Sequence, residues 1–336
     1  MSIELLEETA QAMVAAGKGI IAIDESSTTC KKRFDSVGIE CTEETRRNYR
    51  EMLLTTPKLG DYVSGAILYD ETLRQSSRAG VPFTKIMLDN GILPGIKVDK
   101  GPVPLAGFPG EVVTEGLDGL RDRLKEYARL GAKFAKWRAV INIEDDAPSG
   151  TGIEANCHAL ARYAALCQEA GIVPMVEPEV LMDGNHDIDV CYEITEATLR
   201  SLFGALYEQN VMLEGTILKA SMVISGKDCL EQASVEEVAE MTLRCLKATV
   251  PATLPGVVFL SGGQSDEAAT AHLNAMNQMG AKPWPLSFSY GRAMQSAALT
   301  LWSKDMSANF ASAQQTVFAR AQANGLAALG KWKRAT

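Results

Sequence analysis

The sequence predicts an α/β fold, a closed (β/α)8 barrel (TIM barrel) that forms a single domain over residues 1–336. Eight short apolar runs alternate with stretches of helical period, which indicates a parallel sheet, and eight strands close such a barrel. The open doubly wound sheet is the alternative, but its typical G-x-G-x-x-G motif does not follow the first run. The length of 336 residues also suits one large barrel.

Each apolar run is a candidate strand that ends in polar or charged residues. The runs are 18–26, 64–71, 95–101, 132–140, 171–180, 214–221, 256–263 and 285–292. Apolar residues at helical spacing predict helices over 43–54, 116–130, 154–170, 195–208, 234–247 and 265–279. We also expect an N-terminal helix within residues 1–19 and a C-terminal helix over 309–329. The Pro- and Gly-rich segment 99–114 predicts a long excursion between the third strand and the next helix.

The composition is that of an ordinary folded protein with a large core. Hydrophobic residues make up 46% of the chain and charged residues 22%. The net charge of −9 disfavours nucleic acid or an anionic membrane as a partner, since both attract basic surfaces. No run approaches the ~18 apolar residues of a membrane span, and residues 1–19 do not resemble a signal peptide. The seven scattered cysteines, none in a C-x-x-C motif, predict reduced thiols in a cytoplasmic protein.

Charged residues gather at the ends of successive candidate strands, where the active site of such a barrel lies. Three runs carry pairs spaced two residues apart, and side chains at this spacing share one face of a strand. The pairs are Lys97 and Asp99, Lys136 and Arg138, and Glu177 and Glu179; other strand-end charges are Asp24, Glu25 and Lys219. Because unpaired buried charges are costly, their gathering on successive strands favours a functional cavity over unrelated surface ion pairs.

Lys219 ends a strand-forming run, "EGTILKAS", whose other side chains are typical of a core. Burial and a neighbouring cation such as Lys136 would lower the pKa of its amine. A neutral amine can attack a ketone and form a Schiff base, with Glu177 placed to move protons as the carbinolamine loses water. The protonated imine would then stabilise the carbanion formed when the adjacent C–C bond breaks. The alternative is a lysine whose stem packs on apolar surface while its head reaches solvent.

The last two candidate strands end in groups suited to phosphate. "LSGGQS" brings Ser261, Gly262 and Gly263, and "SFSYGRA" brings Ser289, Gly291 and Arg292 before a helix. The loops after strands seven and eight form the recurrent phosphate site of this fold. A tight turn without a ligand is the alternative for the two glycines taken alone.

A second basic set suggests a second phosphate at the other end of the cavity. It comprises Lys31, Lys32 and Arg33 together with Lys97. For Lys31 and Lys32 we favour a charge run on the surface of a helix.

The histidines and acidic loops do not predict a metal site. His158, His186 and His272 lack paired spacing, and the acidic segment 183–189 lacks the twelve-residue pattern of a calcium loop. We therefore expect no metal and read 183–189 as a solvated loop.

Taken together, the motifs resemble the class I fructose-1,6-bisphosphate aldolases. The matching segments are "DES" with a following "KR", "GIKVDKG", "FAKWR", "VPMVEPE", "LEGTILKAS", "LSGGQS" and "FSYGRA". They occur in order from about Gly17 to about Gly330, nearly the whole chain. The resemblance implies the same barrel fold and the reversible cleavage of fructose 1,6-bisphosphate to glycerone phosphate and glyceraldehyde 3-phosphate. It also implies a metal-independent Schiff base, sugar phosphates as ligands, a homotetramer, and a place in glycolysis, gluconeogenesis or the Calvin cycle.

The resemblance also implies roles for individual residues. Lys219 matches the imine-forming lysine, Glu177 the proton-handling acid and Lys136 the lysine beside it. Asp24 matches a carboxylate that positions the substrate and the imine, and Glu179 matches a second acid. The implied substrate-binding residues are Ser261, Gly262, Gly291 and Arg292 at the C1 phosphate, Arg33, Lys97 and Arg138 near the far phosphate, and Ser289.

The sequence departs from the family pattern at three places. It ends "GKWKRAT", without the flexible tail and terminal tyrosine of many animal and plant members, so the group that protonates the enamine is open. Residues 27–30 read "STTC" where animal members have a glycine and a serine, and we expect a stiffer loop there. Ala220 follows the reactive lysine where proline is common.

Two other functions stay open at this point. The first is another imine-forming barrel lyase, acting on sedoheptulose bisphosphate or on an unphosphorylated keto-acid. The second is a non-catalytic scaffold, against which the intact set of Lys136, Glu177 and Lys219 argues.

Overall fold

Eight parallel strands close into a barrel, so the predicted fold is confirmed. The computed structural model describes residues 3–144 and 146–334. The barrel strands are β1 (Gly19–Ile23), β2 (Val63–Leu68), β3 (Leu93–Lys97), β6 (Phe134–Ile141), β7 (Val173–Val180), β8 (Ile217–Ala220), β9 (Val257–Phe259) and β10 (Leu286–Tyr290). Their order around the barrel is β1-β10-β9-β8-β7-β6-β3-β2. Each candidate strand of the sequence therefore overlaps one strand of the barrel.

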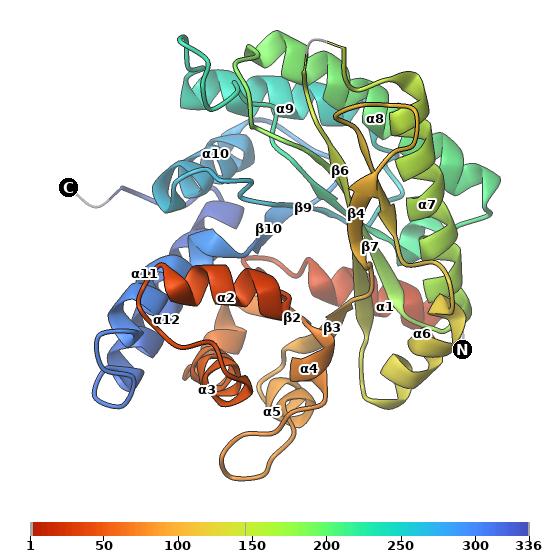
Figure 1. The fold of residues 1–336 in the computed structure, drawn as a ribbon. Coiled ribbons are helices and arrows are strands. Elements are labelled where there is room, and N and C mark those ends of the chain that lie inside the picture. Colours follow the sequence, from red (N-terminus) through yellow and green to blue (C-terminus); the bar gives the residue numbers. More distant parts are fainter. Residues whose placement is uncertain (1–2, 145, 335–336) are drawn as a thin grey trace.

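Helices surround the barrel in an outer layer (Figure 1). The longer ones are α1 (Ile3–Met13), α2 (Ser27–Asp35), α3 (Glu43–Leu54), α6 (Leu120–Arg129), α7 (Gly150–Glu169), α8 (Ile188–Glu208), α9 (Val235–Thr249), α10 (Asp266–Gln278), α11 (Arg292–Trp302) and α12 (Phe310–Ala328). Shorter helices are α4 (Asp70–Leu73), α5 (Phe83–Asp89) and the 3-10 turns η1 (Leu59–Asp61) and η2 (Leu213–Gly215). No helix in the described ranges is long and apolar enough to cross a membrane.

Each predicted helix overlaps one helix of the structure, and the agreement at the helix starts varies. Helix α3 has the predicted bounds, and Thr42 caps its first turn by accepting a hydrogen bond from the Thr45 amide. Helix α8 begins at Ile188, before the predicted 195, because Asp187 accepts from the Val190 amide at 2.9 Å. The end of the acidic segment 183–189 is thus a helix cap rather than a loop.

The prediction of a loop at residues 27–30 is wrong. These residues form the first turn of α2, and the Ser26 side chain caps it by accepting from the Thr29 amide at 3.3 Å. Serine and threonine favour both loops and helix starts, so their composition alone did not separate the two structures. The helical turn brings Arg33 back toward the barrel.

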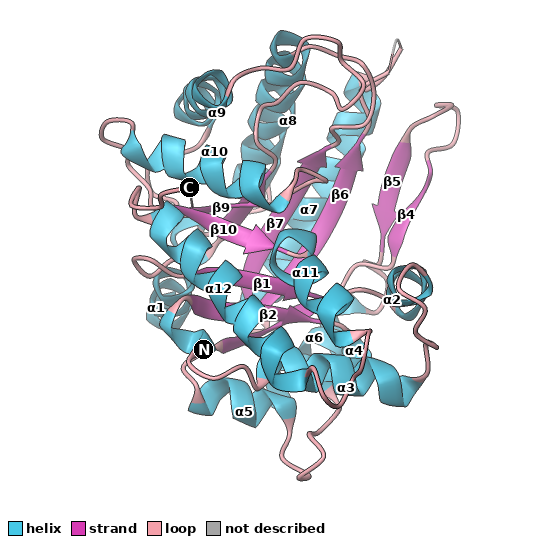
Figure 2. Ribbon diagram, turned by 90° about the vertical axis from the view of Figure 1, so that its left-hand side faces the viewer, coloured by secondary structure: helices cyan, strands magenta, loops and turns pink. Residues whose placement is uncertain are grey.

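The segment predicted as a long excursion contains a small antiparallel sheet. Strands β4 (Gly101–Pro104) and β5 (Val112–Glu115) pair with each other and not with the barrel. Two prolines in β4 concealed it, because proline is tolerated only at sheet edges. Figure 2 shows this hairpin and α2 on the side toward which β10 points, beside the carboxyl ends of the barrel strands.

The barrel interior is apolar at one end and charged at the other. Inward-facing Ile20, Ile67, Val173, Ile217 and Val258 form one buried cluster with residues of α1. The ring of Phe134 fills the same end because β2 and β3 present Gly65 and Gly95 to it, and a Cβ on Gly95 would lie 2.2 Å from that ring. Helix α1 and this cluster close the amino end of the barrel, so the polar residues lie at the carboxyl end.

The seven cysteines are free thiols. Cys41 and Cys229 are half-buried and the other five are buried, in agreement with the expected role of most of them as small core residues.

Candidate active site

A cavity of about 390 Å³ opens at the carboxyl ends of the barrel strands. Seven cationic and five carboxylate side chains line it, an excess of two positive charges in a chain whose net charge is −9. The structure brings all the predicted site residues to this one cavity. They are Asp24, Arg33, Lys97, Lys136, Arg138, Glu177, Glu179, Lys219, Ser261, Gly262, Ser289, Gly291 and Arg292. The roles of these residues remain predictions.

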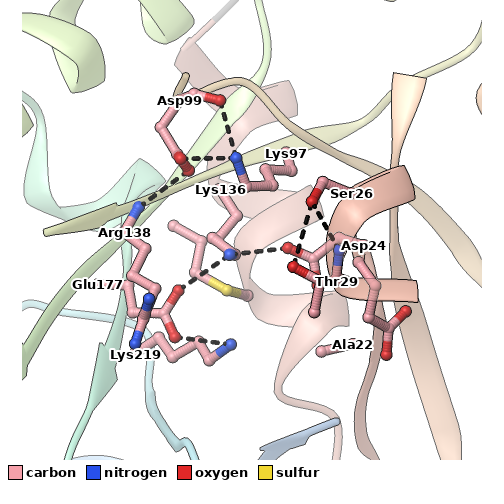
Figure 3. A network of polar contacts seen from close by, with 12 residues as sticks. Ala22, Asp24, Ser26, Thr29, Lys97, Asp99, Lys136, Arg138, Glu177 and Lys219 are labelled. Atoms are coloured by element: carbon pink, nitrogen blue, oxygen red, sulfur yellow. Dashed lines mark hydrogen bonds and ion pairs between the residues drawn. The ribbon is translucent and has the colours of Figure 1, made fainter. Parts of the chain in front are cut away.

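Four of these side chains form a buried group that we call the lysine cluster: Asp24, Lys136, Glu177 and Lys219. Lys136 Nζ lies 2.7 Å from Asp24 Oδ2 and 3.3 Å from Glu177 Oε2. Lys219 Nζ lies 2.9 Å from Glu177 Oε1. Figure 3 shows Glu177 between the two amines. The cluster comes from β6, β7 and β8 and from the end of β1, which are fixed strand positions in the barrel wall.

Lys219 does not send its amine to solvent. Its side chain is 5% exposed, and its Nζ faces Glu177 within the cavity. The structure also adds what the sequence did not indicate: the two lysines share one carboxylate. The environment of Lys219 is therefore an ion pair as well as a neighbouring cation.

The lysine cluster holds its carboxylates in the charged state. Burial alone would raise the pKa of Asp24, but Lys136 and Lys219 outweigh it and lower that pKa. Glu177 has a lowered pKa for the same reason, since burial is outweighed by Lys136, Lys219 and Arg138. Burial opposes the charge on Lys136, but Asp24 and Glu177 raise its pKa above the ordinary range. Carboxylates and ammonium groups thus stabilise one another without solvent.

Glu179 and Arg138 lie on the same strands but form a separate pair. Arg138 Nε donates to Glu179 Oε2, and within the described residues this is the ion pair that Glu179 makes. The structure therefore places Glu179 against an arginine of the cavity wall rather than against Lys219. Asp99 Oδ2 accepts a hydrogen bond from the Arg138 amide at 3.3 Å, so β3 and β6 are tied together at this point.

At one end of the cavity lie the residues after β9 and β10, which we call the loop end: Ser261 to Gly263, Ser289, Gly291 and Arg292. Gly262 and Gly263 have φ values of 60° and 115°, a conformation that L side chains rarely adopt. Ser289 is buried, and its Oγ has no hydrogen-bond partner in the described part of the chain. Arg292 is the first residue of α11, so the positive end of the helix dipole lies there too. These groups can bind a phosphate.

Lys97 and Arg33 line the same cavity from β3 and α2. Lys97 Nζ lies 2.6 Å from Asp99 Oδ1, and Arg33 pairs with Glu25. Lys31 and Lys32 are exposed on α2, and Lys31 pairs with Asp35 one turn later, so the helix-surface interpretation of these two residues is confirmed. The sequence thus identified the basic segment, and in the structure only Arg33 of its three cations lines the cavity.

Several residues of the cavity were not among the predicted site residues. Ser26, Thr29 and Lys100 line it, and Ser26 Oγ lies 3.1 Å from Thr29 Oγ1 (Figure 3). Ser26 and Thr29 stand between the end of β1 and the start of α2, the place where loops of this fold carry site residues. Their position at the end of a strand could have indicated a site, but a serine before a helix is first interpreted as a helix cap.

No three His, Cys, Asp or Glu side chains gather as a metal site in residues 3–144 and 146–334. The metal independence expected from the sequence remains a prediction for experiment.

The fold and the site define a class of protein: a (β/α)8-barrel enzyme with a buried lysine, a shared carboxylate and an anion-binding loop. A family model described as "Glycolytic: Fructose-bisphosphate aldolase class-I" matches residues 4–336. The chain therefore belongs to the class I fructose-bisphosphate aldolase family, and it is a lyase.

Similar proteins agree with this assignment. The chain is 77% identical to "Probable fructose-bisphosphate aldolase class 1" of Xanthomonas campestris pv. campestris, over 99% of this chain and all of that protein. It is 54% identical to "Fructose-bisphosphate aldolase 1" of Toxoplasma gondii, over 97% of this chain and 90% of that protein. The structure is also similar to a fructose-bisphosphate aldolase from Plasmodium falciparum that was crystallised with TRAP and a small-molecule inhibitor. The two superpose with a TM-score of 0.97 at 48% identity, over 99% of this chain and 96% of that chain. The family resemblance found in the motifs is confirmed.

Proposed function

We propose that this chain cleaves fructose 1,6-bisphosphate reversibly to glycerone phosphate and glyceraldehyde 3-phosphate, through a metal-independent Schiff base on Lys219. Membership of the aldolase family supports the overall reaction. The contact of 2.9 Å between Lys219 Nζ and Glu177 Oε1 is the observation that carries the imine chemistry. This contact places a proton acceptor next to a buried amine at the carboxyl end of the barrel.

Imine formation begins with a proton transfer along this contact. The ammonium of Lys219 gives a proton to Glu177, an uphill step because the pKa of Glu177 is lowered, and the neutral amine attacks the C2 carbonyl of the substrate. A proton passes from nitrogen to oxygen, which gives the carbinolamine. Glu177, now a carboxylic acid, returns its proton to the hydroxyl, which leaves as water, and a protonated imine remains. Lys136, held by Asp24 and Glu177, keeps a positive charge beside these steps.

Cleavage then moves electrons into the imine. A carboxylate of the lysine cluster removes the proton of the C4 hydroxyl, and the electrons of the C3–C4 bond pass to the protonated imine, forming an enamine. Glyceraldehyde 3-phosphate leaves. Protonation at C3 and addition of water to the restored imine release glycerone phosphate and the free amine.

The two phosphates occupy opposite ends of the cavity in this proposal. The loop end takes the C1 phosphate, with Ser261, Gly262, Ser289, Gly291 and Arg292 as donors. Arg33, Lys97 and Arg138 take the far phosphate. Glu179 supports the far end by orienting Arg138, and Asp24 positions Lys136. The excess positive charge of the cavity favours a substrate with two anionic groups.

Borohydride trapping tests this function most directly. The protein is mixed with glycerone phosphate in EDTA, reduced and digested, and the modified peptide is located by mass. We expect an adduct on Lys219 with loss of activity. An untrapped protein that cleaves only without EDTA would contradict the imine and the absence of a metal together. A folded chain without any cleavage would support a scaffold instead.

Two lysine variants make the trapping specific. Lys219→Met should lower kcat by on the order of 10⁴-fold or more and abolish the adduct, because no other group supplies the amine. Lys85→Met is the control, since Lys85 is exposed and pairs with Asp89 at the surface. This variant should keep both the activity and the adduct. An adduct that persists in Lys219→Met would place the imine on another lysine.

Assembly and location rest on the family alone. We propose a homotetramer in the cytoplasm, which sedimentation equilibrium of the purified protein and fractionation of cells would test. Assay with sedoheptulose 1,7-bisphosphate would show whether the far end also accepts a longer sugar.

A further inference from the structure

Beneath α2, outside the lysine cluster, lies a second buried polar network centred on Glu25. Glu25 follows Asp24 at the end of β1, and its side chain is 5% exposed. Arg50 of α3, 2% exposed, brings Nη2 to 2.7 Å from Glu25 Oε2 and also donates to the Glu25 carbonyl at 3.4 Å. Two buried charges are expensive unless they have a partner and a use. The imine chemistry uses neither of them.

The same carboxylate binds Arg33, the cation of α2 that reaches the cavity. Arg33 Nη1 donates to Glu25 Oε1, and the Arg33 side chain is 29% exposed. Among the described residues this is the side-chain hydrogen bond that Arg33 donates. A guanidinium has five N–H donors arranged in a fork, so the remaining N–H groups stay available for a phosphate.

A comparison within α2 shows how selective this contact is. Lys31, Lys32 and Arg33 are consecutive cations, but only Arg33 lines the cavity. Lys31 pairs at the surface with Asp35, and Lys32 is exposed. The buried carboxylate therefore holds one cation of the three toward the substrate.

Gln295 ties this network to α11. Its Nε2 donates to Glu25 Oε1 at 3.0 Å and to the Ala22 carbonyl at 2.6 Å. Its Oε1 accepts from the Tyr49 hydroxyl at 3.0 Å, and Gln295 is 1% exposed. Gln295 belongs to α11, the helix that begins at Arg292. Glu25 thus connects α2, the helix of Arg33, with α11, the helix that begins at Arg292.

We propose that Glu25 is a positioning residue that holds Arg33 at a fixed spacing from Arg292 and so sets the preference for substrates with two phosphates. The proposal rests on the proposed function, because it takes Arg33 as a ligand of the far phosphate. An arginine already held in place loses less conformational freedom when the phosphate binds. Buried Arg50 and Gln295 keep the carboxylate itself from turning away.

The test compares a substrate that has the far phosphate with one that lacks it. The ratio of kcat/KM for fructose 1,6-bisphosphate to that for fructose 1-phosphate is measured for wild type, Glu25→Gln, Glu25→Asp and Arg33→Ala. We expect Glu25→Gln to lower this ratio by about 10- to 100-fold, through KM of the bisphosphate, as for the loss of a charge-assisted hydrogen bond. The kcat on the monophosphate should stay unchanged.

Two further variants distinguish positioning from a structural role. Glu25→Asp keeps the charge opposite Arg50, so it folds even if Glu25→Gln does not, and its shorter reach should lower the ratio by a smaller factor. In an Arg33→Ala background the Asp substitution should change the ratio no further, because the positioned group is absent. An unchanged ratio in Glu25→Asp, or equal losses on both substrates, would overturn the proposal. If wild type itself cleaves neither substrate, the proposed function fails instead.

Discussion

The lysine cluster and the loop end share one cavity but differ in how their polar groups are partnered. In the lysine cluster each charged group faces an opposite charge: Lys136 contacts Asp24 and Glu177, and Lys219 contacts Glu177. At the loop end, Ser289 Oγ has no hydrogen-bond partner and Arg292 has no carboxylate within 4 Å in residues 3–144 and 146–334. The reacting groups hold one another, whereas the loop-end groups have capacity for a ligand.

This difference follows from what each region must do before substrate arrives. Proton transfer requires donor and acceptor in contact, and the barrel strands hold Lys219 and Glu177 at 2.9 Å. An unpaired buried hydroxyl such as that of Ser289 costs about 1–3 kcal/mol, and a bound phosphate would recover this cost. The comparison therefore predicts that damage to the lysine cluster lowers kcat and damage to the loop end raises KM.

After Lys219→Met, the largest effect is expected for Glu177→Gln. Glutamine cannot accept the proton of Lys219, and it leaves two buried ammonium groups facing a neutral amide. We expect kcat to fall by about 10²- to 10⁴-fold with a smaller change in KM, measured in a coupled assay with single-turnover imine trapping. The control is Glu169→Gln at the exposed Arg121 pair, which should keep full activity. Rapid imine formation in Glu177→Gln would remove Glu177 from the proposed proton transfer.

A smaller effect, on binding, is expected for Arg292→Ala. The variant removes the loop-end cation that has no carboxylate partner in the described chain. KM for fructose 1,6-bisphosphate should rise about 10- to 100-fold, and kcat should change less. Lys304→Ala is the control, because Lys304 is exposed just beyond the end of α11. A loss confined to kcat would break the distinction between the two regions.

The smallest effect is a dependence of stability on pH that belongs to the lysine cluster. Lys136 and Lys219 lower the folded pKa of Asp24 against the effect of burial. A lowered pKa contributes stability above the unfolded value of about 4, and this contribution is lost as the pH falls through the folded pKa. Wild type should exceed Asp24→Asn in free energy of unfolding by about 1–3 kcal/mol at pH 7, with the gap closing below pH 4.

Urea unfolding at pH 7, 5 and 3.5 would measure this gap. Asp35→Asn is the matched control, since Asp35 pairs with Lys31 on the exposed side of α2 and should show no such trend. A gap that stays constant down to pH 3.5 would mean that Asp24 does not titrate as a member of the cluster.

Much of the barrel and most of the cavity were predictable because they follow local rules. Alternation along a strand puts Lys136 with Arg138, and Glu177 with Glu179, on the face that the structure turns inward. The pairing of these side chains was not predictable. It depends on register between strands, which sets Arg138 beside Glu177 on adjacent strands while its side chain pairs with Glu179.

The contacts that sequence reasoning missed join residues far apart along the chain. Glu25 meets Arg50 of α3 and Gln295 of α11, and neither pairing leaves a periodic signal in the sequence. The first turn of α2 was missed for another reason, since it is rich in serine and threonine, which also suit loops. Strands β4 and β5 are too short, and β4 too rich in proline, to stand out.

The filled amino end of the barrel bears on the order in which molecules come and go. Phe134 and the apolar cluster under α1 occupy that end, so substrate and products pass through the opening at the carboxyl ends of the strands. Under the proposed chemistry one fragment is covalently bound to Lys219 while the other is free. The aldehyde must then depart first, and in the synthetic direction the ketone must arrive first. The filled amino end leaves one opening for both fragments, and the covalent bond to Lys219 fixes the order in which they use it.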